Sequence, residues 1–163
     1  MSDLNGILRR GLLGALALVM CLAATPVGRP QTGLRIETLD VVTMQGVRHF
    51  RVEIADTDPT RQTGMMWRTR VGPDEGMLFD FKAPRDGVAF WMKNTLIPLD
   101  IIFISPQGRV ISIARNARPR DETPLPAGGT VLGVLEIGGG RAAALGILPG
   151  DQVRARMFTR VQR

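Results

Sequence analysis

Apolar and polar residues alternate most regularly over residues 47–55, where Phe50, Val52 and Ile54 point one way and the polar residues between them point the other. A repeat of two residues is the period of a β-strand with one buried face. Residues 100–105 are apolar almost throughout, which predicts a central strand. Similar patterns predict further strands over residues 34–43, 77–81, 88–93, 109–115, 130–137 and 152–158, the first of them at an edge of the sheet.

Two short segments carry helix signals. Asp58 suits an N-cap and Pro59 the first helical position, so we expect a helix from there to about Arg68. Residues 141–145 predict the second helix, and residues 116–129, with three Pro and two Gly, predict a long loop of the kind that often carries function. The fold class predicted is mainly β: a compact, closed or nearly closed β-barrel-like single domain with two short helices.

The composition fits this fold. A chain of 163 residues has the length of one domain, and 19 Gly and 11 Pro suit short strands joined by turns. Six Phe, two Trp and no Tyr mean that the core is mainly aliphatic. We expect a signal peptide over residues 1–24, a linker over 25–33 and the β-rich domain over 34–163.

The signal is predicted by the N-terminal pattern. Arg9 and Arg10 precede residues 11–24, an apolar run without charge that is too short to span a membrane as a helix. We therefore expect an exported protein, periplasmic or extracellular, and the alternative is a membrane anchor formed by an uncleaved N-terminus. Cleavage after Ala23 or Ala24 would remove Cys21, which is the only cysteine, so neither a disulfide nor a Cys-based metal site is expected.

The chain is basic. Its 21 basic and 15 acidic residues become 19 and 14 without residues 1–24, which leaves a net charge of +5. The arginines are spread along the sequence, so they predict a solvated surface better than an anion-binding patch. We expect no nucleic-acid partner, no cofactor and no membrane contact beyond the signal segment, and a small molecule or a cell-envelope component as the partner.

The best candidate binding site follows the aromatic residue Phe90. Trp91, Lys93, Asn94 and Thr95 combine an aromatic ring with an ammonium, an amide and a hydroxyl, a mixture typical of small-ligand pockets. The alternative is turn chemistry, because Asn and Thr side chains often bond to nearby backbone where a strand bends. With Asp100 beside it, and the 116–129 loop as a lid, this stretch predicts a ligand pocket.

Two acids lie in apolar strands, Asp100 at the start of one and Glu136 near the end of another. If neighbouring strands bring them together, they form an acid/base pair for a small hydrolase or lyase. The alternative is that each acid is structural, paired with Arg68, Lys93 or backbone amides.

A third hypothesis is a Cu(I) carrier. The residues that suggest it are His49, Met65, Met66, Met77 and Met92, with the two tryptophans nearby. Thioethers and imidazole suit Cu(I), but methionine also fills gaps in a core that is poor in aromatics, and we expect no metal site on this basis.

Several motifs together resemble a known family. They are GMMWR at 64–68, GMLF at 76–79, FWMKNT at 90–95 and IPLDIIFI at 97–104. Over residues 47–158 the chain resembles the domain of unknown function 192, also called uncharacterised ACR. The resemblance implies a compact, mainly β domain of bacteria and archaea, often behind an export signal, with no established activity. The signature residues that it implies are Arg68, Trp91, Asn94, Thr95, Asp100 and Glu136.

Taken together, the sequence predicts an exported small-ligand-binding or accessory domain rather than an enzyme. Its predicted ligand-binding residues are Arg68, Trp91, Lys93, Asn94, Thr95 and Asp100.

Overall fold

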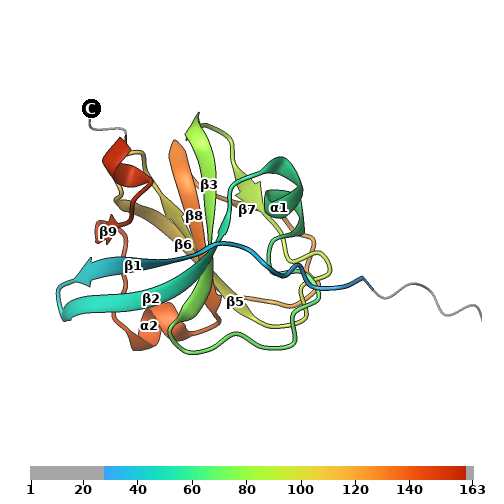
Figure 1. The fold of residues 1–163 in the computed structure, drawn as a ribbon. Coiled ribbons are helices and arrows are strands. Elements are labelled where there is room, and N and C mark those ends of the chain that lie inside the picture. The colour runs from blue at the N-terminus through green and yellow to red at the C-terminus, as the bar shows by residue number, and fades with distance from the viewer. Residues whose placement is uncertain (1–27, 161–163) are drawn as a thin grey trace, which may run out of the picture.

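The structure is a computed structural model that describes residues 28–160. The predicted signal peptide and the start of the linker lie outside these residues. The strands are β1 (Ile36–Thr43), β2 (Gly46–Ala55), β3 (Glu75–Arg85), β4 (Ala89–Phe90), β5 (Leu99–Ile104), β6 (Val110–Ala117), β7 (Leu125–Pro126), β8 (Val131–Gly138) and β9 (Gln152–Arg154). The helices are α1 (Asp58–Thr63), α2 (Arg141–Ala144) and the 3-10 helix η1 (Phe158–Arg160) (Figure 1).

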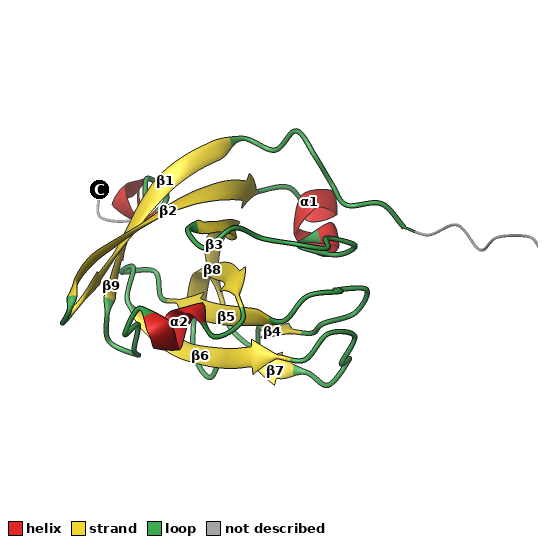
Figure 2. Cartoon of the chain, turned by 90° about the horizontal axis from the view of Figure 1, so that it is seen from below, coloured by secondary structure: helices red, strands yellow, loops and turns green. Residues whose placement is uncertain are grey.

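Seven strands form one strongly curled sheet in the order β6-β5-β8-β3-β2-β1-β9 (Figure 2). Its two outer strands meet where Arg109, just before β6, forms a bridge with Gln152 of β9. The Val153 amide also donates to the Gly108 carbonyl at 2.7 Å. The predicted mainly β, nearly closed fold is therefore confirmed.

The strand predicted at the edge lies one place inside it. β9 pairs with three residues of β1, so β1 has a neighbour on each side over that stretch. The prediction was wrong because the partner strand is only three residues long and lies far away in the sequence. The expected strand over residues 152–158 correspondingly ends at Arg154.

β5 and β8 are buried on both faces. On β5, Ile102 packs into a first core with β1, β2, β9 and α2, whereas Ile101 and Phe103 pack into a second core with β3 and β4. All six side chains of β5 are buried, which explains its continuous apolar sequence. β8 is also covered on both faces, so its sequence is an apolar run as well. The acid within it, Glu136, must therefore face one of the two cores.

The predicted strand over residues 88–93 is shorter than expected. Only Ala89–Phe90 is extended, and it pairs with β7 inside the segment that was predicted to be a loop. The Thr95 amide donates to the Met92 carbonyl at 3.0 Å, so the chain turns there.

Helix α1 starts and ends earlier than expected. Its N-cap is Thr57, not Asp58, and Thr57 and Thr60 form a reciprocal capping box. The helix ends at Gly64, not near Arg68, because Gly64 adopts a φ of +49° that other residues rarely adopt. Over residues 28–160, no helix combines the length and apolar character that a membrane crossing requires.

Candidate functional site

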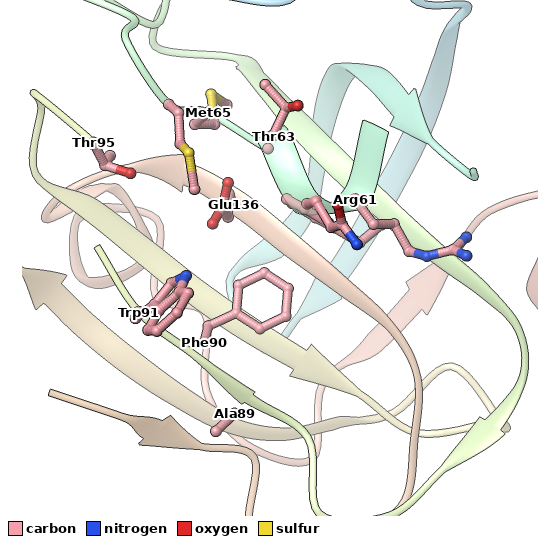
Figure 3. A pocket seen from close by; sticks show the side chains of 12 residues that line it. Arg61, Thr63, Met65, Ala89, Phe90, Trp91, Thr95 and Glu136 are labelled. Carbon is pink, nitrogen blue, oxygen red and sulfur yellow. The ribbon is translucent and has the colours of Figure 1, made fainter. Parts of the chain in front are cut away.

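A cavity of about 540 Å³ opens beside the second core, between the end of α1 and the strands β3, β4 and β8. Figure 3 shows the side chains around it, with the Glu136 carboxyl group in their midst. The lining residues are Arg61, Gln62, Thr63, Gly64, Met65, Met66, Phe79, Ala89, Phe90, Trp91, Thr95 and Glu136.

Glu136 is the polar centre of this cavity. Its residue is only 5% exposed, and the Met65 backbone amide donates to its carboxylate. Among the described residues, its Oε2 has no hydrogen-bond partner. Burial away from water raises the pKa of Glu136 to about 8, although the Met65 amide and the Arg68 charge act in the opposite direction. The group is therefore mostly a neutral carboxylic acid at pH 7.

Arg68 lies outside the cavity lining. Its guanidinium forms an ion pair with Glu53 and donates to the Gln31 carbonyl at 3.2 Å. These contacts engage part of the guanidinium, whose buried Nε has no partner among the described residues. The Arg68 charge only partly offsets the effect of burial on the pKa of Glu136. Arg68 also lines a separate, smaller hollow of about 130 Å³.

The two aromatic residues of the predicted site take different positions. Trp91 is 49% exposed and lines the cavity, and the Lys93 ammonium lies 5.3 Å from its ring centroid. Phe90 packs edge-on against Phe79, with ring centroids 4.9 Å apart, and against Phe103. Phe90 thus anchors the strand by its ring contacts, while Trp91 presents a ring to solvent.

Asn94 and Thr95 show the turn chemistry that was the alternative prediction. Asn94 has a φ of +55°, its carbonyl accepts from the Trp67 amide at 2.9 Å, and its side-chain amide donates to the Met66 sulfur at 3.9 Å. The buried Thr95 hydroxyl donates to the Lys93 carbonyl at 3.3 Å. Thr95 also lines the cavity, and Asn94 is not among the lining residues.

Asp100 is fully buried, and it serves the backbone. Its carboxylate accepts from the amides of Asn116 at 2.6 Å, Gly140 at 3.1 Å and Ala142 at 2.7 Å. Since Gly140 is the N-cap of α2 and has no side chain to cap it, Asp100 takes over that task from β5. Asp100 does not line the cavity.

Asp100 and Glu136 do not form a pair. On the antiparallel strands β5 and β8, Glu136 lies opposite Ile101, and Asp100 lies opposite Ile137. Directly opposite residues share a face, and successive residues alternate between faces. Asp100 therefore points to the face of the first core and Glu136 to that of the second, so the predicted acid/base pair was wrong.

His49 lies apart from the methionines that suggested the copper hypothesis. The His49 side chain is 77% exposed and bonds to Asp40 at 2.7 Å on the outer face of β2. Met77 lies opposite Glu53, four residues further along β2, which is about 13 Å at the usual strand rise. Met65, Met77 and Met92 are buried in the second core, as the core-packing alternative predicted.

The 116–129 segment supports the site from the side. The Met92 amide donates to the Asp121 carbonyl at 2.8 Å, the Arg120 amide donates to the Thr95 carbonyl at 3.1 Å, and β7 pairs with β4. None of its residues lines the cavity, so it is not the predicted lid. It holds β4, the strand directly before Trp91.

Sequence reasoning missed the part of the lining that α1 supplies, including Arg61 and Thr63. It also ranked Glu136 behind Asp100. One signal for Glu136 was available, because it is the only charged residue in the apolar strand VLGVLEIG. A charged residue buried in such a strand needs a hydrogen-bond or ion-pair partner, or else has a functional role.

Comparison with known proteins places the chain among proteins without an assigned activity. It is 51% identical to a protein of unknown function from Novosphingobium aromaticivorans, whose crystal structure superposes with a TM-score of 0.74 over 82% of this chain and 94% of that one. It is 36% identical to a protein from Sinorhizobium meliloti described as a proposed transcription regulator, with a TM-score of 0.74 over 78% of this chain and 98% of that one. Among curated proteins, no match was found.

A family model described as uncharacterised ACR matches residues 40–155, which include all of β2 to β9 and the second half of β1. This agrees with the resemblance drawn from the FWMKNT and IPLDIIFI motifs. The chain belongs to the domain of unknown function 192 family.

Proposed function

We propose that this protein is an exported small-ligand-binding domain and that its ligand occupies the cavity around Glu136. The observation that carries the proposal is the buried Oε2 of Glu136, a residue of the cavity lining, for which the described residues supply no hydrogen-bond partner. A buried polar atom left unsatisfied costs about 1–3 kcal/mol, and native proteins keep few of them. A bound ligand would satisfy the atom.

The dimensions of the cavity support the proposal. Its volume of about 540 Å³ falls within the range of small-molecule sites. Its lining is also of the usual kind, mostly apolar and aromatic with a few polar groups.

Binding accounts for the site better than acid/base catalysis by paired carboxyls. Glu136 is the only acid among the described residues that line the cavity. Glycoside-type chemistry uses two carboxyl groups on either side of the bond that is cleaved. The other candidate, Asp100, is engaged by three amides behind the sheet.

Export is supported by the N-terminal sequence alone. Arg9 and Arg10 followed by the apolar residues 11–24 fit a secretory signal, and the domain begins after a short linker. A periplasmic or extracellular location makes a small molecule or a component of the cell envelope the expected partner.

Native mass spectrometry of protein purified from the exported fraction tests both parts of the proposal. We expect a chain that has lost about its first 24 residues and carries a small-molecule adduct. In Trp91→Ala the adduct should be lost, because the exposed ring at the cavity is gone. Leu148→Ala is the control, since Leu148 is exposed to a similar degree (51% against 49%) and does not line the cavity.

Two results would contradict the proposal. A full-length chain in the cytoplasmic fraction would refute export, and a full-length chain in the membrane fraction would indicate an uncleaved anchor. An exported chain without any adduct, or with an adduct unaffected by Trp91→Ala, would refute binding in this cavity.

A further inference from the structure

Two hydroxyl groups of the cavity lining can only accept hydrogen bonds from a ligand, whereas the exposed Gln62 amide can both donate and accept. The Thr63 hydroxyl donates to the Pro59 carbonyl at 2.9 Å, and the Thr95 hydroxyl donates to the Lys93 carbonyl at 3.3 Å. Each hydroxyl has one proton, so both have only lone pairs left for a ligand. These two groups therefore call for ligand donors, such as hydroxyl groups.

Among the described residues, Arg61 is the only cationic side chain that lines the cavity, and it is already engaged. Arg61 donates to the Asp80 carbonyl at 2.7 Å and pairs with Asp58, and Figure 3 shows its guanidinium pointing away from Glu136. Lys93 lies over the Trp91 ring. An anionic ligand thus finds no free cation in the lining, and a cationic ligand stacked on Trp91 would meet the charge of Lys93.

The other charged groups on the elements that surround Glu136 form ion pairs elsewhere or point to the opposite face of the sheet. Arg68 is paired with Glu53, Asp80 of β3 is paired with Lys82, and Asp100 of β5 points to the opposite face of the sheet. Burial therefore dominates the state of Glu136, which keeps its proton at neutral pH. In that state its carboxyl group offers an O–H donor to a ligand oxygen.

Trp91, directly after β4, adds a half-exposed aromatic ring at the mouth of the cavity, and the Lys93 ammonium lies over one of its faces. A pyranose ring has one face of C–H groups that stacks on such a ring, and a rim of hydroxyl groups that both donate and accept. It thus matches the stacking surface, the two acceptor hydroxyls and the single acid donor at once.

We propose that the ligand is an uncharged saccharide, which stacks on Trp91 and accepts a hydrogen bond from the neutral carboxylic acid of Glu136. This inference rests on the proposed function, since it assigns the ligand class of the same cavity. This binding mode requires no charge on the ligand or on Glu136.

Isothermal titration calorimetry of the exported chain tests the inference. The probes are two uncharged disaccharides, cellobiose and N,N′-diacetylchitobiose, and the matched diamine chitobiose. We expect an uncharged disaccharide to bind at pH 6.5 and the diamine to bind more weakly. The affinity should fall about tenfold between pH 7 and pH 9, because the protonated fraction of Glu136 falls by that factor when its pKa is about 8.

The variant Glu136→Gln sharpens the test. Its amide still donates a hydrogen bond but does not ionise, so it should retain binding of the uncharged disaccharide and lose the dependence on pH. Binding that prefers the diamine at pH 6.5 and disappears in Glu136→Gln would show that the carboxylate binds a cation, and would overturn the inference.

Two further results separate this inference from the proposed function. If none of the three disaccharides binds while the native protein carries an adduct that depends on Trp91, the saccharide assignment is wrong and the ligand-binding function stands. If a disaccharide binds equally in the wild type and in Trp91→Ala, with no effect of pH, both are wrong.

Discussion

Glu136 should make the protein less stable as the pH rises, and Glu136→Gln should abolish this effect. In the folded chain, burial raises its pKa to about 8 from an ordinary value of 4.5. Between these two values the folded state holds a proton that the unfolded state releases, so stability falls as the pH rises. Below pH 4.5 both states are protonated and the group has no effect, and above pH 8 the loss is complete.

The size of the effect follows from the two pKa values. A difference of one pKa unit corresponds to about 1.4 kcal/mol, so the shift from 4.5 to about 8 amounts to about 5 kcal/mol at high pH. At pH 7 the loss is about 3 kcal/mol. This is a large part of the 5–15 kcal/mol that usually stabilises a domain.

Urea denaturation at pH values from 4.5 to 9 measures the effect. The free energy of unfolding of Glu136→Gln should be close to that of the wild type at pH 4.5 and exceed it by about 3 kcal/mol or more at pH 8. The matched control is Glu122→Gln at an exposed position, which should change stability by less than about 0.5 kcal/mol at every pH.

A pH-independent difference between Glu136→Gln and the wild type would refute the reasoning. It would mean that Glu136 titrates alike in the folded and unfolded states, as a solvated carboxyl group does. The cavity would then be wet, and the neutral donor on which the saccharide inference depends would not exist.

Three other changes test the remaining assignments. Asp100→Asn should lower the free energy of unfolding, measured by urea denaturation, by about 2–4 kcal/mol, because it weakens three charge-assisted bonds from backbone amides. The control Asp74→Asn, at an exposed ion pair, should lower it by less than about 1 kcal/mol. Equal small losses in both variants would contradict the structural role of Asp100. Gly64→Ala should lower the free energy of unfolding, measured by heat or urea denaturation, by about 1–3 kcal/mol. The reason is that Gly64 has a φ of +49° and that an added Cβ would lie 3.1 Å from the Phe79 ring. His49→Ala should change the free energy of unfolding by less than about 1 kcal/mol. It should also leave the affinity for Cu(I) unchanged, as measured by competition with a chromophoric chelator. A large drop in that affinity would support the copper hypothesis.

The fold was predictable where local pattern and tertiary environment agree. The alternation of β2 predicted which of its residues are buried, and the apolar run at 100–105 predicted a strand covered on both faces. β9 shows the limit, because three residues carry too little pattern to reveal that they pair with β1 from the far end of the chain. The α1 cap shows another limit, since both Thr57 and Asp58 are good N-cap residues and the choice depends on the reciprocal bond to Thr60.

The candidate site was predicted in part. The Trp91–Thr95 turn was identified because aromatic and polar residues cluster there in the sequence. The contribution of α1 was missed, because Arg61 and Thr63 approach Trp91 only after the chain folds back over β3. The lid was misassigned because a long loop beside a site is as well suited to supporting a strand as to covering a cavity.

Asp100 and Glu136 explain why the sequence alone ranked the two acids in the wrong order. Both are buried on adjacent strands, and a register in which Glu136 lies opposite Ile101 sends them to opposite faces. On its face, Asp100 meets three amides at the start of α2, so its hydrogen-bonding capacity is used by the fold. Glu136 meets one amide and a cavity, so one oxygen is left over. Both residues are buried carboxyl groups, and they differ in how much of their hydrogen-bonding capacity the fold leaves unsatisfied.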